Sequence, residues 1–142
     1  MVVQGTSFTA VLKADGTVWA AGLNTYGVLG NGTTKYSADL EQVKIDENTN
    51  LTNVVRIAAG ASHMLAVTKE GNVYSVGLGT SGQLGVKSTA NSSYAQKVLD
   101  ETGEGYLSNI IDVSAGLAHS VALDSDGKVY AWGKGANYQL GN

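Results

Sequence analysis

A 26-residue segment occurs three times in this sequence, and the repeat constrains the fold more than any other feature. Residues 5–30, 60–85 and 116–141 align without a gap, at offsets of 55 and 56 residues. Six columns are identical in all copies: Gly5/Gly60/Gly116, Gly16/Gly71/Gly127, Val18/Val73/Val129, Gly22/Gly77/Gly133, Leu29/Leu84/Leu140 and Gly30/Gly85/Gly141. A fixed period of this length indicates a repeat architecture such as a propeller, in which each copy is one structural unit.

Each copy predicts short antiparallel strands. Segments such as "TVWAAG" and "HSVALD" are apolar and rich in β-branched and aromatic residues. The acidic-glycine pairs between such segments are interpreted as two-residue hairpin turns: Asp15-Gly16, Glu70-Gly71 and Asp126-Gly127. With 19 glycines, no proline and no sustained helical periodicity, the chain is predicted to be all-β. Strands are expected at residues 6–12, 17–22, 54–59, 62–68, 72–77, 109–115, 118–124 and 128–133, with outer strands near 41–46 and 95–99.

Four strands per period make a propeller blade. The predicted fold is therefore a partial β-propeller of about three blades, each a four-stranded antiparallel meander. The copies span about residues 1–52, 53–107 and 108–142 of a single repeat region, the first and last copies being incomplete. Because about two and a half blades cannot close into a ring, we expect closure within a longer chain or by self-association.

The repeated columns resemble the regulator of chromosome condensation repeat family. Their patterns are G-x-x-H-[ST]-x-A-[LV], D-G-x-V-[YW]-x-W-G and G-Q-L-G, and "GLAHSVALDSDGKVYAWG" at residues 116–133 fits best. The resemblance covers essentially the whole chain and implies a propeller, usually of seven blades, whose ring closes by sharing one blade between the chain ends. The chain departs from the pattern at Phe8 in the first His position, at Ala21 and Val76 in the Trp position, and at Val28 in the Gln position.

One glycine pattern, "GLGTSG" at residues 77–82, has the spacing of a dinucleotide-binding turn. The equivalent segments read "GLNTYG" and "GKGANY", and no helical pattern follows residue 82. Such a turn also needs an acidic residue about 20 positions further on, which is missing here. We therefore interpret the repeated glycines, and Asn24 where one is replaced, as positions that need a positive φ.

No catalytic, cofactor-binding or metal-binding residue is predicted. The column of His63 and His119 holds Phe8 in the first copy, which favours a packing or hydrogen-bonding role over a ligand or a base. Acidic residues at 100–104 are interpreted as solvated loop charges, and "DSDG" at 124–127 as a hairpin turn rather than part of a calcium loop. The residues expected to be structural are Gly60, His63, Gly116, His119, Leu84 and Gly85.

Charge and composition narrow the classes of partner that the chain is expected to bind. The net charge is −3, with 9 basic and 12 acidic residues scattered along the chain, which argues against nucleic acid and anionic membranes as partners. There is no cysteine, and the first residues have no signal-peptide pattern. These features do not identify the cellular compartment. The polar composition, rich in Asn, Thr, Ser and Gly, favours a bacterial secreted or cell-surface protein.

The function expected from the sequence is a non-catalytic scaffold for protein–protein interaction, because the loops vary while the strands repeat. The loops at 23–27, 78–82 and 134–138 are the predicted binding face; their alternative role is to cap neighbouring blades. The candidate residues are Tyr26, Asn24, Thr80, Ser81, Asn137 and Tyr138. Other functions remain open: guanine-nucleotide exchange on a small GTPase, which the resemblance alone implies, an enzyme with a site in the propeller channel, and a structural repeat of a larger surface protein.

Overall fold

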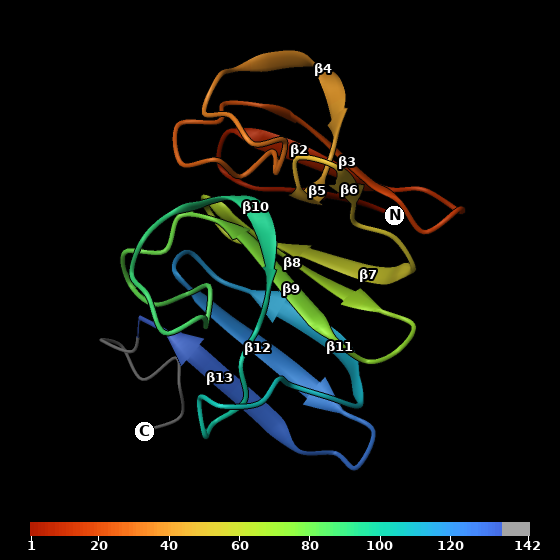
Figure 1. Ribbon diagram of the computed structural model, residues 1–142, viewed down its shortest axis with the longest axis vertical. Helices are drawn as coiled ribbons and strands as arrows, with labels where there is room; N and C mark the ends of the chain where they lie inside the picture. The colour runs from red at the N-terminus through yellow and green to blue at the C-terminus, as the bar shows by residue number, and fades with distance from the viewer. Residues whose placement is uncertain (135–142) are drawn as a thin grey trace.

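The computed structural model describes residues 1–134, which contain only strands, turns and loops and no helix (Figure 1). Blade 1 is a sheet of β1 (Val2–Gln4), β2 (Phe8–Leu12), β3 (Val18–Gly22) and β4 (Ser37–Gln42), in that order. Blade 2 contains β7 (Val54–Ala59), β8 (His63–Thr68), β9 (Val73–Gly77) and β10 (Ser92–Lys97). Blade 3 contains β11 (Ile110–Ala115), β12 (His119–Asp124) and β13 (Val129–Gly133). These sheets confirm the predicted all-β, open partial propeller of antiparallel blades.

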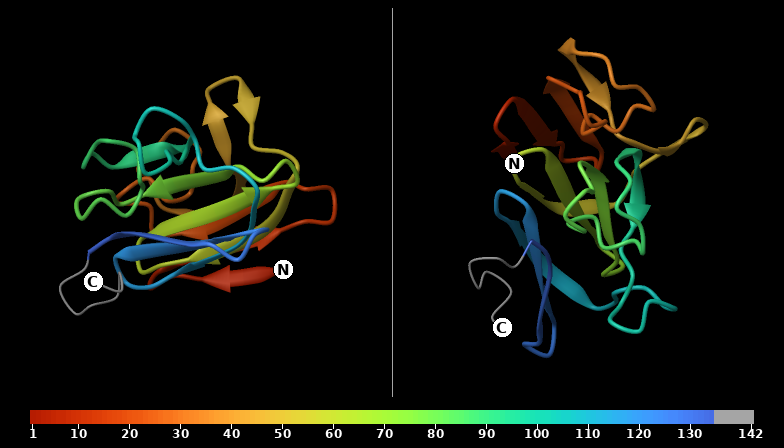
Figure 2. Two further views of the ribbon diagram at one scale, coloured as in Figure 1. Left: turned by 90° about the horizontal axis from the view of Figure 1, so that it is seen from below. Right: turned by 90° about the vertical axis from the view of Figure 1, so that its left-hand side faces the viewer.

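The three blades stack on one another in the order of the chain. Figure 1 shows them from red at the top to blue at the bottom, and the right-hand view of Figure 2 shows the same order. One apolar cluster joins blades 1 and 2 and contains Phe8, Val18, Met64 and Val76. A second joins blades 2 and 3. All six residues of β8 are buried, because blade 2 has a neighbour on each face.

The hairpin turns differ from the prediction. Residues 13–17 join β2 to β3, with Lys13 N donating to Thr17 O (2.9 Å) and Gly16 N donating to Lys13 O (3.0 Å). Of residues 13–17 only Gly16 has a positive φ, of 84°. A two-residue hairpin turn formed by Asp15-Gly16 would need a positive φ at both of these residues. The connection is a three-residue loop whose glycine adopts the left-handed conformation. Asp15 Oδ1 holds it by accepting from Thr17 N at 3.0 Å.

The outer strands were predicted too late in the sequence. β4 begins at Ser37 and β10 at Ser92, several residues before the expected 41–46 and 95–99. Residues 44–46 instead form β5 (Lys44–Asp46), which pairs with β6 (Thr49–Asn50) in a small hairpin. Three of the six residues of β4 are exposed, so this edge strand lacks the apolar alternation that reveals a buried strand.

In each copy a glycine lies three residues before the column of Phe8, His63 and His119. Because glycine has no side chain, the ring at that column can lie against the glycine backbone. A Cβ atom added to Gly5, Gly60 or Gly116 would overlap the ring three residues later, which belongs to Phe8, His63 or His119. None of these three glycines has a positive φ. Their requirement is therefore for space rather than for a left-handed backbone.

Candidate functional site

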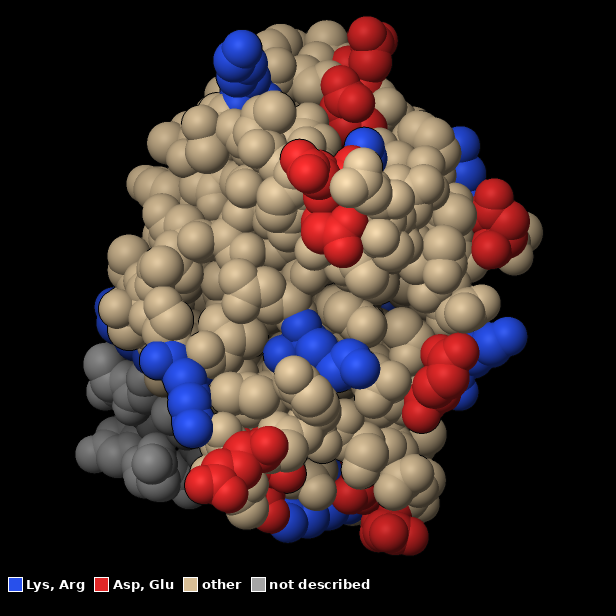
Figure 3. Space-filling model, viewed as in Figure 1, with Lys and Arg blue, Asp and Glu red and all other residues tan. Residues whose placement is uncertain are grey.

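The turns after the inner strands and the loops after the third strands lie at the same end of every blade. Backbone hydrogen bonds of 2.9 Å join them, from Leu23 N to Ser7 O, from Leu78 N to Ser62 O and from Lys134 N to Ala118 O. We call this end, on the left of Figure 1, the loop end. Its longest loop segments, residues 23–33 and 78–86, contain no charged residue. Uncharged residues also dominate the left-hand surface above the grey region in Figure 3.

A cleft opens at the loop end between blades 1 and 2. Its volume is about 350 Å³, and we call it the loop-end cleft. The residues that line it are Thr6, Ser7, Phe8, Leu23, Thr25, Tyr26, Val28, Ala61 and Ser62. The side chains of Phe8 and Val28 are buried and belong to the core between the blades, whereas Leu23 and Tyr26 remain 52% and 41% exposed. The cleft thus has an apolar base and a rim of apolar and hydroxyl groups.

A third exposed apolar side chain lies at the loop end, in blade 3. Leu117 is 77% exposed and, with Ala61 and Thr6, lines a shallow hollow where the three inner turns meet. The sequence had pointed to the loop at 23–27, which contains Leu23 and Tyr26, but not to Leu117 or to the base of the cleft. The signal for Leu117 was a leucine in a turn whose counterparts in the other copies are Thr6 and Ala61.

Asn24 does not have the role predicted for it. It is 1% exposed, its Oδ1 accepts from Leu29 N at 2.9 Å, and its Nδ2 donates to Thr33 O at 2.9 Å. It is also not among the residues with a positive φ, so the predicted left-handed backbone is wrong. The short amide side chain of Asn24 closes the loop at residues 24–33 through these two hydrogen bonds. Asn24 therefore shapes the loop that carries Tyr26 and is not itself surface for a partner.

The other candidate loop residues are placed as follows. Thr80 and Ser81 are exposed at the loop end of blade 2, where Ser81 N donates to Gln83 Oε1 at 2.9 Å. The side chain of Leu84 behind them is fully buried. Asn137 and Tyr138 lie outside the described residues.

His63 is a buried polar group between blades 2 and 3. Its Nε2 lies 3.0 Å from Ser120 Oγ, and Ser120 Oγ donates to Gln83 O at 2.8 Å. Because the serine has one proton and gives it to a carbonyl, the histidine must donate from Nε2. Burial lowers the pKa of His63 to about 4, so its ring is neutral at neutral pH. This arrangement supports a structural role for His63.

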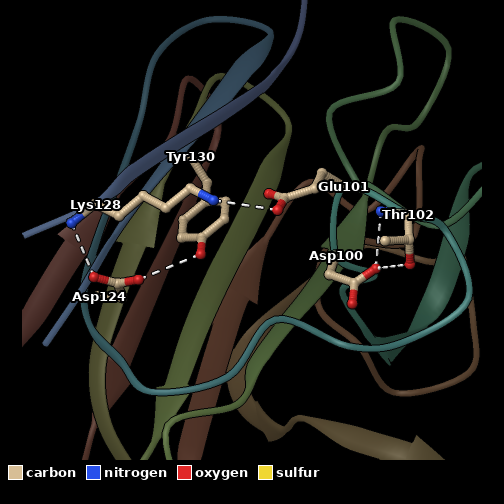
Figure 4. Close-up of polar contacts among 6 residues, drawn as sticks. All are labelled: Asp100, Glu101, Thr102, Asp124, Lys128 and Tyr130. Carbon is tan, nitrogen blue, oxygen red and sulfur yellow. Dashed lines mark hydrogen bonds and ion pairs between the residues drawn. The ribbon is translucent and has the colours of Figure 1, made fainter. Parts of the chain in front are cut away.

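A polar cluster surrounds the hairpin between β12 and β13 (Figure 4). Asp124 Oδ1 accepts from Lys128 N at 2.9 Å, and its Oδ2 accepts from Tyr130 Oη at 3.3 Å. Lys128 Nζ contacts Glu101 Oε1 at 3.2 Å. The backbone hydrogen bond from Lys128 lowers the pKa of Asp124, the bond to Glu101 raises the pKa of Lys128, and desolvation raises the pKa of Tyr130.

Two carboxylates of this region, Asp100 and Asp124, act as acceptors within their own turns. Asp100 Oδ1 accepts from Thr102 Oγ1 and from Thr102 N at 3.0 Å, and these bonds lower the pKa of Asp100. Charges that stay ionised and hold turns are typical of structure rather than of general acid–base chemistry. Within residues 1–134 no group of three or more His, Asp or Glu side chains could hold a metal ion. The same residues include no helix long and apolar enough to cross a membrane.

Comparison with protein families identifies the repeat. A family model described as "Regulator of chromosome condensation (RCC1) repeat" matches residues 15–67 and 70–123, and a second model of that repeat matches residues 54–83 and 110–139. The chain belongs to the RCC1 repeat family. The family resemblance expected from the sequence is thereby confirmed.

Curated relatives contain this RCC1-repeat segment within longer chains. The ultraviolet-B receptor UVR8 of Arabidopsis thaliana is 36% identical over 99% of this chain, which corresponds to 30% of UVR8. The E3 ubiquitin-protein ligase HERC2 of Mus musculus is 32% identical over 99% of this chain but only 3% of its own length. The chain thus spans less than a third of these relatives.

Solved structures show the same RCC1 fold. Human WBSCR16 is 27% identical and matches 96% of this chain and 34% of its own with a TM-score of 0.79. Prp20p of Saccharomyces cerevisiae is 22% identical and matches 99% of this chain and 34% of its own with a TM-score of 0.81. The second likeness supports the fold alone.

Proposed function

We propose that this RCC1-repeat chain is a non-catalytic scaffold that binds a protein partner at the loop-end cleft. The observation that carries the proposal is an apolar cleft with exposed Leu23 and Tyr26 on its rim, in an uncharged stretch of surface. Exposed aromatic and aliphatic side chains beside a preformed pocket are typical of protein-binding hot spots. Leu117 extends the apolar surface across the inner turns.

The chemistry of the cleft defines the kind of partner. Its buried base, formed by Phe8 and Val28, suits one large apolar or aromatic side chain of the partner. The hydroxyl groups of Thr6, Thr25 and Ser62 around it suit hydrogen bonds to the partner's backbone. None of the described residues that line the cleft is charged, so binding should depend little on salt.

Family members give this proposal context. Yeast RCC1 (Prp20) has been solved bound to Kap60, and the study of Prp20p also addressed its binding to Gsp1p and histones. Those partners are protein partners of a propeller with this fold. We infer that the present chain also binds a protein, and the kind of segment it binds follows from the chemistry of the cleft rather than from these relatives.

The test compares two alanine variants. Proteins crosslinked to the parent chain in extracts of the source organism are identified, and binding of the purified partner is then measured by calorimetry. Leu23→Ala with Tyr26→Ala should weaken binding about tenfold or more, because it removes the apolar rim. Tyr106→Ala is the matched control: Tyr106 is similarly exposed but lies in the connector before β11, away from the cleft. Equal affinity of the double variant and the parent would refute the assignment.

A further inference from the structure

The loops that follow the third strands of blades 1 and 2 share one backbone conformation. In blade 1 Gly27 N donates to Asn24 O at 2.9 Å, and in blade 2 Gly82 N donates to Gly79 O at 2.9 Å. The φ angles of Gly27 and Gly82 are 85° and 78°. Because the two backbones match, the side chains at equivalent positions of these loops can be compared directly.

Val28 and Gln83 occupy the same position in the two loops. A Cβ atom added to Gly77 of blade 2 would lie 3.1 Å from Val28 Cβ, and one added to Gly133 of blade 3 would lie 3.2 Å from Gln83 Cα. Each residue thus lies against the end of the third strand of the next blade, and both are buried. The two positions are therefore equivalent in structure and differ in the chemistry of the side chain.

The amide of Gln83 closes its own loop from within. Gln83 Oε1 accepts a hydrogen bond from Ser81 N at 2.9 Å, and the glutamine is 0% exposed. The main-chain oxygen of Gln83 accepts from Ser120 Oγ at 2.8 Å and from Trp132 Nε1 at 2.9 Å, which fixes the residue against blade 3. The second loop therefore supplies the acceptor for its own main-chain donor.

Val28 leaves the equivalent donor of the first loop without an acceptor. Tyr26 N is the counterpart of Ser81 N, and within the described part of the chain it donates no hydrogen bond to another residue. Valine is shorter than glutamine and has no polar atom, so it neither fills the same space nor pairs with Tyr26 N. Tyr26, Val28 and Phe8 all line the loop-end cleft. The cleft thus has an unpaired main-chain donor beside its apolar base, at the place where the second loop holds its own amide.

We propose that Val28 determines the specificity of the loop-end cleft by leaving the place of the Gln83 amide to the partner. A carbonyl oxygen of the partner accepts from Tyr26 N, and an adjacent large apolar side chain packs on Phe8 and Val28. This inference rests on the proposed function, in which the cleft binds a protein, and adds the hydrogen bond that orients the bound segment. A carboxylate is a poor acceptor here, because none of the described residues that line the cleft is charged and the desolvation of the carboxylate would be uncompensated. The segment that binds therefore presents an uncharged amide carbonyl next to an apolar side chain.

The probe for this inference is N-acetyl-L-phenylalanine N-methylamide, which combines an aromatic ring with amide carbonyls. Its binding to the isotopically labelled chain is followed by the chemical shifts of the backbone amides. The parent should show saturable shifts around the cleft at millimolar concentrations of so small a ligand, and the Tyr26 amide proton should move downfield as it gains an acceptor. Val28→Gln should move the Tyr26 amide proton downfield without the probe. It should also weaken probe binding about tenfold or more, because its own amide takes the place of the probe's carbonyl.

Val55→Gln is the matched control for introducing a glutamine. Val55 is 51% exposed near the start of β7, where the neighbouring Val54 N donates to Gly16 O at the end of the blades opposite the loop end. This variant should bind the probe as the parent does. Phe8→His with Val28→Gln recreates the combination of the second copy and should also lose the probe, so a folding defect in the single variant would not hide the result.

Three results would overturn the inference. They are no saturable binding of the probe to the parent, binding without a downfield shift of the Tyr26 amide proton, and binding to a folded Val28→Gln as tight as to the parent. Failure of the proposed function gives a different result, because Leu23→Ala with Tyr26→Ala tests the cleft itself. If the purified protein partner is lost by that double variant but is bound equally by the parent and by Val28→Gln, the proposed function stands and this inference fails.

Discussion

Acidification should destabilise this protein through one buried side chain, His63. Its pKa is about 4 in the folded protein, against an ordinary value of 6.5 that applies to the unfolded chain, because burial disfavours the charged ring. Between these values the unfolded chain binds a proton that the folded chain does not. The contribution of His63 to stability is therefore fully present above pH 6.5 and is lost as the pH falls toward 4.

The size of the effect follows from the difference in pKa. A pKa difference of about 2.5 corresponds to a limit of about 3.4 kcal/mol, reached below pH 4. Between pH 7.5 and pH 5 the expected loss in the free energy of unfolding is about 2 kcal/mol. His63→Phe, which installs the residue of the first copy, should remove this loss because phenylalanine does not titrate.

Urea titrations at several pH values between 7.5 and 5 measure the effect. The free energy of unfolding is compared between the parent and His63→Phe at each pH, so contributions from other titrating groups cancel. Val55→Ala serves as the control because it changes an exposed side chain of β7 and keeps His63; its loss should match the parent's. Parallel curves for the parent and His63→Phe would show that the ring of His63 is hydrated, and would refute the reasoning.

Further substitutions probe the packing and the loops by chemical denaturation. Val73→Ala and Leu84→Ala should each lower the free energy of unfolding by about 1–4 kcal/mol, because both side chains are fully buried; unchanged stability would mean that they are exposed. Gly60→Ala should cost about 1–3 kcal/mol because the added Cβ overlaps the His63 ring. Asn24→Ala should cost about 1–3 kcal/mol by leaving the buried Leu29 N unpaired, whereas Tyr26→Ala should change stability by less than about 0.5 kcal/mol; equal effects would contradict the role given to Asn24.

The repeat predicted β2, β3 and the first three strands of blades 2 and 3 well because those strands are short, apolar and at least partly buried, whereas β1 was not among the expected strands. β7 was placed at its observed bounds, Val54–Ala59, and β8 within one residue. The outer strands were misplaced because an edge strand such as β4 faces solvent and its position depends on pairing with β3, not on hydrophobicity. The local sequence pattern thus shows which strands are buried. The position of an edge strand depends instead on its pairing partner, which only the tertiary structure shows.

The candidate site was predicted only in part. The variable loop containing Tyr26 could be found because its sequence differs among the copies. The cleft could not, because Ala61 and Ser62 belong to blade 2 and reach Leu23 only through the stacking of the blades. Asn24 was misassigned because an asparagine suits both a left-handed backbone and a hydrogen-bonded loop, and only the positions of Leu29 and Thr33 decide between them.

β8 is covered by blade 1 on one face and by blade 3 on the other, and this limits the substitutions that the middle copy tolerates. A substitution on either side of β8 alters one of the two clusters between the blades, while the strand has no solvent-facing side to absorb it. Corresponding positions in β12 alternate between one buried and one accessible side, so half of them can vary at small cost. In hydrogen exchange the β8 amides should therefore be the last to open. Random mutagenesis should find the middle copy the least permissive of the three, even though all three share one pattern.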